Sequence, residues 1–306
     1  TTSGAAADVS GGGVRLNQIP RDGGNTISGS LFLGYQNESF QADNVTDALR
    51  ARNVRTADGI GKLANVEGAF GGPIKKDKVW YFASARNFLL DTLPANTFYG
   101  QAGTGSNFVA PTSTSEKAVD AQSIKSVQAR LIWQMSQKNK LAVYNDRLLK
   151  NRGSAMQAGF DPRTAGIIWN SPIYTTGSIK FTSTVSSKIF VEGGFSTNFE
   201  RYNTIYQEGL QKERTDPAWY TTINRTDNGR GTQWGAGAGI NGMYPDSLSL
   251  AGSVAYVTGS HNVKVGVQDH WGTYRNTRLA NGDLRAVFNN GVPLSVNILN
   301  TPVDYT

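Results

Sequence analysis

The sequence predicts an all-β fold of long antiparallel strands, and three observations support this prediction. Apolar and polar residues alternate along most of the predicted strands, so they fall on opposite faces of a sheet. The strands run about ten residues or more, against a usual length of about five or six. The connections alternate between short and long. Strand length and loop asymmetry favour an antiparallel transmembrane β-barrel; a soluble β-sandwich explains the alternation equally well, but not these two features.

Composition agrees with strands and turns. The 306 residues include 35 glycines and 12 tyrosines, and the mean hydropathy is −0.38. A membrane barrel tolerates this polarity because only every second strand residue faces lipid and the loops are polar. No run of 18 apolar residues occurs, so no transmembrane helix is predicted.

Several classes of site are excluded or disfavoured. The chain has no cysteine, which rules out a disulfide framework and a thiolate metal site. The formal net charge is +7, but the basic residues are scattered rather than clustered with aromatics, so no nucleic-acid partner is predicted. The sequence starts at Thr1 without a methionine or an apolar leader, so we expect any signal peptide to have been removed or to lie outside it.

The first three strands are expected at residues 28–36, 64–72 and 79–88. Residues 37–64 are polar and charged and are expected to form a long loop. The connection at 71–78 contains two glycines, a proline and three lysines. Proline cannot donate to a strand ladder and glycine accepts positive φ, so the chain turns there. Prolines and a Thr/Ser run make 89–122 a second long loop.

The alternation is clearer from the fourth strand onward. Strands four to seven are expected at 127–135, 140–149, 177–185 and 188–198, with turns at 136–139 and 186–187 and a long loop ending near 171. Ile132 and Phe190 are out of pattern. Residues 201–246 are expected to form the longest loop. Strands eight and nine follow at 248–256 and 262–268, the latter extending to 275, with a turn at 258–260. A weaker tenth strand is expected at 284–288, and the tail from 289 is the least regular part.

The charged residues indicate which face meets lipid. Arg130, Lys180, Glu192 and Lys264 share the polar faces of their strands, and a basic residue at mid-depth on a lipid face costs about 2–4 kcal/mol. We therefore expect these four to face the lumen and the Val/Leu/Ile/Phe series to face outward. Aromatic residues near strand ends would then form an interfacial girdle, although aromatics favour strands in general.

No catalytic or metal-binding arrangement is predicted. His261 and His270 are nine residues apart on one strand, so they lie on opposite faces and cannot share a metal. Asp269 and His270 are adjacent and point apart. No GxSxG, P-loop or HExxH motif is present. We therefore expect no enzyme, no metal and no cofactor.

The long loop at 201–246 is the best ligand-binding candidate. Its aromatic rings offer flat faces to sugars, peptides or chelates, and its arginines suit carboxylates. The simpler alternative is that these residues pack the loop against itself. The candidates are Trp219, Tyr220, Arg225, Arg230, Trp234 and Tyr244.

Residues 1–27 have few large apolar side chains and cannot form a core alone. Arg15, Arg21, Asp22 and Asn25 are candidates to pair with wall residues such as Arg130 or Glu192. Local turn formation at 22–25 is the simpler alternative.

Two stretches, 10–32 and 68–82, resemble the plug-to-barrel junction and the first periplasmic turn of TonB-dependent outer-membrane receptors of the Oar-like branch. The resemblance implies that residues 1–27 end a plug that lies mostly before Thr1, and that 28–306 form about ten strands of a plugged barrel of about 22 strands in the Gram-negative outer membrane. It further implies contact with outer-membrane lipid, coupling to the TonB–ExbB–ExbD complex through a more N-terminal region, and energised uptake of a solute such as a siderophore, an oligosaccharide or a peptide.

Two alternatives remain open from the sequence. One is a ten-stranded outer-membrane barrel with a hydrolytic site in its loops. The other is a soluble, secreted carbohydrate-binding β domain.

Overall fold

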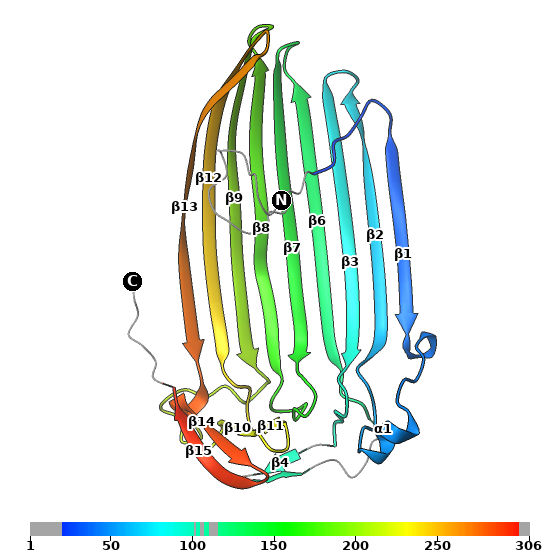
Figure 1. Ribbon diagram of the computed structural model, residues 1–306, viewed down its shortest axis with the longest axis vertical. Helices are drawn as coiled ribbons and strands as arrows, with labels where there is room; N and C mark the ends of the chain where they lie inside the picture. The colour runs from blue at the N-terminus through cyan, green and yellow to red at the C-terminus, as the bar shows by residue number, and fades with distance from the viewer. Residues whose placement is uncertain (1–19, 101, 105–106, 110–115, 300–306) are drawn as a thin grey trace.

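A nine-stranded antiparallel sheet dominates the structure (Figure 1). The computed structural model describes residues 20–100, 102–104, 107–109 and 116–299. Spatial order follows chain order once two small inserts are set aside. The strands of this sheet are β1 (Ser28–Asn37), β2 (Gly59–Lys75), β3 (Val79–Leu93), β6 (Asp120–Gln134), β7 (Asn139–Ala155), β8 (Ile167–Thr184), β9 (Ile189–Tyr206), β12 (Ile240–Thr258) and β13 (His261–Leu279).

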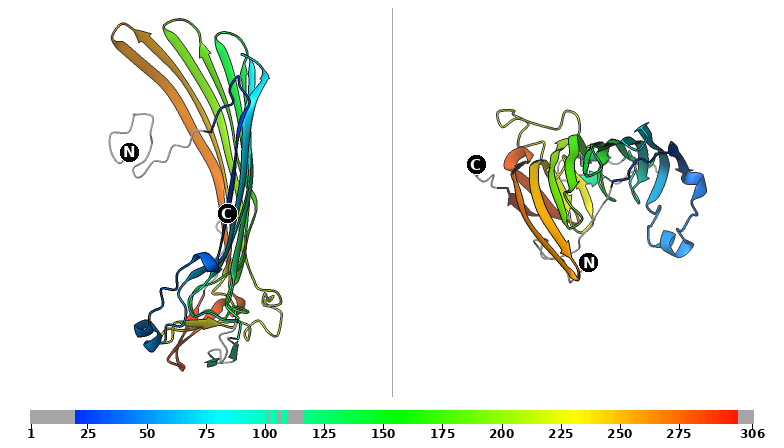
Figure 2. Two further views of the ribbon diagram at one scale, coloured as in Figure 1. Left: turned by 90° about the vertical axis from the view of Figure 1, so that its right-hand side faces the viewer. Right: turned by 90° about the horizontal axis from the view of Figure 1, so that it is seen from above.

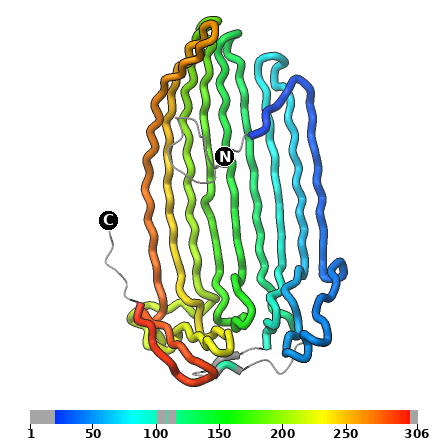
Figure 3. The backbone as a smooth tube through the Cα atoms, viewed as in Figure 1, coloured from blue at the N-terminus to red at the C-terminus, as the bar shows by residue number. Residues whose placement is uncertain are grey.

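Short turns lie at one end of the sheet and long connections at the other, which confirms the predicted alternation (Figure 3). The four short turns join β2 to β3, β6 to β7, β8 to β9 and β12 to β13. Two of them contain residues with positive φ, Asp77 (59°) and Gly259 (50°). Asparagine, aspartate and glycine adopt this backbone region most readily.

Most strands are longer than predicted, because they extend toward the long connections. β12, for example, begins at Ile240, inside the predicted loop at 201–246, and β9 continues to Tyr206. Each face of these extensions mixes polar with apolar or aromatic residues, so the alternation of hydrophobicity fades although the backbone ladder continues. The Arg201–Asp246 ion pair, with Nη1 and Oδ1 2.6 Å apart, joins two such extensions.

The tenth predicted strand forms, but not in the main sheet. β14 (Leu284–Asn289) belongs to a four-stranded sheet with β10 (Asn224–Asp227), β11 (Thr232–Trp234) and β15 (Val292–Ile298). Gly282 and Asp283 both have positive φ, at 70° and 49°. The chain therefore turns away after β13, and β14 pairs in parallel with β10. The main sheet of the described residues therefore has nine strands, and the tenth predicted strand lies outside it.

The four-stranded sheet lies at the long-connection end and contains much of the buried apolar core. Phe108, Trp234 and Phe288 form one buried cluster there. The carboxylate of Asp227 accepts three backbone N–H groups, one from the turn after β10 and two from the β14–β15 turn, and so ties these two turns together. These donors are Arg230 at 3.1 Å, Asn290 at 2.9 Å and Gly291 at 2.7 Å.

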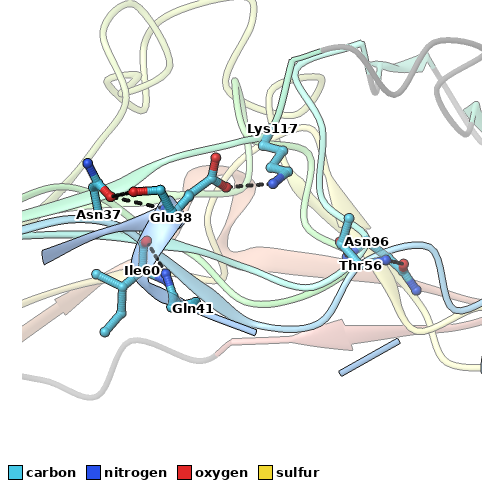
Figure 4. Close-up of polar contacts among 8 residues, drawn as sticks. Asn37, Glu38, Gln41, Thr56, Ile60, Asn96 and Lys117 are labelled. Carbon is cyan, nitrogen blue, oxygen red and sulfur yellow. Dashed lines mark hydrogen bonds and ion pairs between the residues drawn. The ribbon is translucent and has the colours of Figure 1, made fainter. Parts of the chain in front are cut away.

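Side chains also tie the first long connection to the sheet and to the second long connection (Figure 4). Where β1 ends, the amide of Gln41 accepts from the N–H of Ile60 (2.9 Å) and donates to its carbonyl (2.5 Å), so it replaces the missing neighbour strand. Lys117 and Glu38 form an ion pair at 2.5 Å. These connections include two short helices, η1 (Glu38–Phe40) and α1 (Asp47–Ala51), and a hairpin of β4 (Ala102–Thr104) and β5 (Asn107–Val109). No helix in the described ranges is long and apolar enough to cross a membrane.

The main sheet is curved and open (Figure 2). Among the described residues, β1 and β13 are its edges and do not pair with each other. The predicted all-β, antiparallel architecture is therefore confirmed, whereas a closed barrel is not observed. Residues 20–27 cross the concave face of the sheet (Figures 1 and 2).

The two faces differ as the sequence predicts. Arg130, Lys180, Glu192 and Lys264 share the concave face, as the strand registers show. The convex face carries aliphatic and aromatic side chains that stay exposed: Ile179 is 48% exposed and Val267 is 73% exposed. No second sheet of the described chain covers these side chains. Others exposed on this face are Leu31, Leu33, Phe70, Val127, Leu131, Trp133, Val143, Phe195, Leu250, Val254, Val263 and Val265.

Candidate functional site

The N-terminal described segment, residues 20–27, is fixed to the concave face at Asn25. The Asn25 Oδ1 accepts from the Trp80 indole N–H (2.6 Å) and the Asp77 backbone N–H (3.0 Å), and its Nδ2 donates to Asp77 Oδ1 (2.6 Å). Gly23 lies flat on β3, because a Cβ at this position would fall 2.1 Å from the Tyr81 carbonyl oxygen. Only glycine permits so close an approach.

Within the described residues, Asp22 and Arg130 form the one ion pair that joins this segment to the main sheet. The Asp22 Oδ1 lies 2.7 Å from Arg130 Nε, and Arg130 is the more buried partner. Next to this ion pair on the same face, the Tyr144 hydroxyl donates to Gln128 Oε1 (3.1 Å). The Nε2 of Gln128 in turn donates to Ser84 Oγ (2.6 Å). The sequence named both charged partners, and the structure brings them together.

The other predicted contacts of this segment are placed differently. Glu192 pairs with two lysines of the main sheet, Lys180 at 2.8 Å and Lys264 at 3.6 Å. Arg21 makes no ion pair within the described part of the chain, and Arg15 lies outside the described residues. A role for Arg15, Arg21 or Glu192 in holding a plug stays a prediction.

The six ligand candidates of the 201–246 region do not converge on one site. Trp219 is 2% exposed and Trp234 is 1% exposed, so neither indole offers a free face. Arg225 donates to the carbonyls of residues 221 and 223, and Arg230 donates to that of residue 290. Tyr220 is exposed, and Tyr244 lies on β12 at the convex face. Packing of the region against itself accounts for most of these side chains, and ligand binding by them stays a prediction.

A different aromatic cluster lies on the concave face near the long connections. The Lys150 ammonium sits 3.8 Å from the centroid of the Trp169 ring, and Trp169 meets Tyr202 edge to face at 4.6 Å. The neighbouring Arg152 binds the Asp120 carboxylate through both Nε and Nη2. Rings and charges of this kind suit sugars or peptides. Sequence reasoning missed this cluster because it assigned Trp169 and Tyr202 to loops.

A serine–histidine contact also lies on the concave face. The Ser249 Oγ is 2.6 Å from His270 Nδ1, and Ser247 Oγ is 3.4 Å from Nε2. Ser249 and His270 are directly opposite in the β12–β13 hairpin. The two-residue turn at 259–260 sets this register, so counting outward from the turn would have found the pair. No acidic side chain completes a triad among the described residues, and His270 is exposed.

The described residues contain no group of three or more potential metal ligands. A scan of protein-family models and searches of curated proteins and of solved structures found no match to the chain. The function proposed below therefore rests on the geometry and on the sequence resemblance.

Proposed function

We propose that the chain forms the first wall strands and the plug end of a TonB-dependent type of outer-membrane receptor. Such a receptor takes up a solute such as a siderophore, an oligosaccharide or a peptide. The observation that carries the proposal is the two-faced main sheet: one long antiparallel sheet with an uncovered apolar convex face and a polar concave face. No enzymatic activity or cofactor is part of this proposal.

The convex face supports a lipid contact. Monomeric soluble proteins rarely expose contiguous apolar patches larger than a few hundred Å², and here exposed apolar side chains continue from β1 to β13. Eight of the nine strands have 15 to 19 residues, roughly 50–60 Å at about 3.3 Å per residue. A tilted strand of about ten residues crosses the apolar band of an outer membrane, so these strands are long enough to cross it and project beyond it.

The concave face supports a removable plug. The described segment is held by an ion pair and by the polar contacts of one asparagine, rather than by a large apolar interface. Each hydrogen bond that water can replace contributes only about 0.5–1.5 kcal/mol net to stability, so the segment can be released at a small cost in free energy. Under this proposal the TonB–ExbB–ExbD complex supplies the pull, through a more N-terminal region. The Lys150–Trp169–Tyr202 cluster offers the solute a platform near the long loops.

Two adjacent residues of β8 test the lipid contact. Ile179 is on the convex face and Ser178 on the concave face. On a lipid face, Ile179→Arg is expected to cost about 2–4 kcal/mol and to lower outer-membrane assembly sharply, whereas Ser178→Arg is expected to be tolerated. The measurement is the heat-modifiable gel band of the outer-membrane fraction. If Ile179→Arg leaves a soluble, folded protein unchanged, as exposed substitutions usually do within about 0.5 kcal/mol, the soluble β domain is favoured and the proposal fails.

The Ser249–His270 contact favours one alternative, a hydrolase on the concave face. A serine within hydrogen-bond reach of a histidine is the minimal arrangement for nucleophilic catalysis. Labelling by a serine-reactive fluorophosphonate that disappears in both Ser249→Ala and His270→Ala would support it. An unlabelled protein would leave the pair a structural cross-strand contact.

A further inference from the structure

A row of basic side chains crosses the convex face where the apolar band ends on the long-connection side. Lys125 (β6), Arg147 (β7), Arg201 (β9) and Arg275 (β13) lie on two adjacent rungs of the sheet. With about 4.8 Å between strands, the row is roughly 24 Å wide. The pairings that fix it are Val127 with Arg147, Ile173 with Arg201, and Tyr244 with Arg275.

Most of the charge in this row is uncompensated. Within the part of the chain that the structure describes, Arg201 alone of the four has an acidic partner, Asp246. Arg147 donates to the carbonyl of Pro172. Lys125 and Arg275 are exposed, and neither forms an ion pair among the described residues. The row therefore presents a positive stripe to whatever covers the convex face.

Tyr244 joins two of the basic residues. Its ring centroid lies 4.5 Å from the Arg275 guanidinium carbon and 5.9 Å from that of Arg201, and its hydroxyl donates to Asn203 (2.7 Å). A tyrosine with an apolar ring and a bonded hydroxyl is typical of the boundary between hydrocarbon and water. The residues of the row are therefore typical of a membrane–water interface rather than of a fully solvated surface.

The spacing of the row from the short turns matches one leaflet boundary. From Lys125 to the end of β6, the convex face carries Val127, Ala129, Leu131 and Trp133. About ten residues at about 3.3 Å, tilted by about 45°, span roughly 23 Å, close to the height of an outer-membrane apolar band. Asp269, on the edge strand β13, is an acidic exception inside this band.

We propose that this basic row binds the phosphate groups of anionic lipid heads in the leaflet on the long-loop side. Guanidinium groups bind phosphate through two parallel hydrogen bonds, and a lysine adds a point charge. The apolar band directly below the row holds the acyl chains of the same lipids, which is why a lipid, rather than free phosphate or an acidic protein, is the partner that fits. The inference rests on the proposed lipid contact of the convex face and adds a lipid preference to it.

The test compares three proteins in phosphatidylcholine vesicles with and without phosphatidic acid. They are the wild type, the row variant Lys125→Gln/Arg147→Gln/Arg275→Gln, and a charge-matched control, Arg50→Gln/Arg52→Gln/Arg55→Gln, near α1. Lipid enrichment around the purified protein is read by mass spectrometry after gentle detergent extraction. A basic residue near an anionic surface contributes about 1 kcal/mol, so each substitution in the row is expected to lower the enrichment of phosphatidic acid about fivefold.

The outcomes separate the two proposals. If the wild type does not insert into phosphatidylcholine, the lipid contact itself fails. If all three proteins insert but the wild type shows no enrichment of phosphatidic acid, or the control variant loses as much as the row variant, the basic row is not a lipid-phosphate site. Loss confined to the row variant, unchanged by excess inorganic phosphate, supports the site. Full displacement by inorganic phosphate overturns the assignment to lipid.

Discussion

Replacing Asp22 with Asn is expected to loosen the N-terminal segment from the concave face. The Arg130 side chain is 17% exposed and Asp22 is 47% exposed, with Nε and Oδ1 2.7 Å apart. Exposed pairs are worth about 0.2–1 kcal/mol, and removing one partner of a fully buried pair costs about 3–5 kcal/mol. The Asp22–Arg130 pair is half-exposed, so the free-energy cost of removing its acidic partner should lie between these two ranges, at about 1–2 kcal/mol. Since about 1.4 kcal/mol is tenfold, the population with a lifted segment should rise about tenfold.

The backbone amide of Asp77 reports this opening, because it donates to Asn25 on the same segment. Its hydrogen-exchange rate is expected to rise about tenfold in Asp22→Asn and to recover in the charge-swapped pair Asp22→Arg/Arg130→Asp. Glu67→Gln is the matched control: Glu67 faces Arg86 on the same face at 4.0 Å with both side chains well exposed, so exchange at Asp77 should not change. Unchanged exchange in Asp22→Asn would refute the idea that this ion pair holds the segment.

Two further predictions concern the four-stranded sheet. Trp234→Ala removes a buried ring from the cluster with Phe108 and Phe288 and should destabilise that sheet by about 3–5 kcal/mol, measured by exchange of the β10 and β14 amides against unchanged β6 amides. Burial alone would raise the pKa of Asp227, but its hydrogen bonds from three backbone N–H groups hold that pKa below its usual value. A lowered pKa stabilises the folded state above the unfolded pKa of about 3.9, so protection of β14 should fall as the pH drops below about 4. In Asp227→Asn, the protection of β14 should already be lower at neutral pH, and it should change less as the pH is lowered.

The sequence predicts the main sheet well where one strand face is apolar. Alternation located β6, β8, β9, β12 and β13, and turn residues located the short connections. Alternation fails where each face mixes polar and apolar residues, which is why the predicted strands are shorter than the observed β9 and β12. A strand is defined there by its backbone ladder, and side-chain hydrophobicity carries no information about it.

The candidate sites were only partly predictable, for a related reason. The pairing of Asp22 with Arg130 follows from charge and from the expected position of the segment on the polar face. The Trp169–Tyr202 contact depends on register beyond a bulge between Asn170 and Ile173, and no local signal gives that shift. The burial of Trp234 depends on Phe288 of β14, more than 50 residues later in the chain. The local sequence does not reveal this contact, so Trp234 is predicted to be an exposed loop residue.

The main sheet is a meander in which every neighbouring pair of strands is consecutive along the chain, apart from the two inserts. A hairpin can therefore be duplicated or deleted without rerouting any other connection. The number of strands in the main sheet can therefore change in steps of two, while each existing pair keeps its register. Folding can follow the same modular route, with each hairpin added to the edge of those already formed, and the inserts at the far end are free to diversify without disturbing that growth.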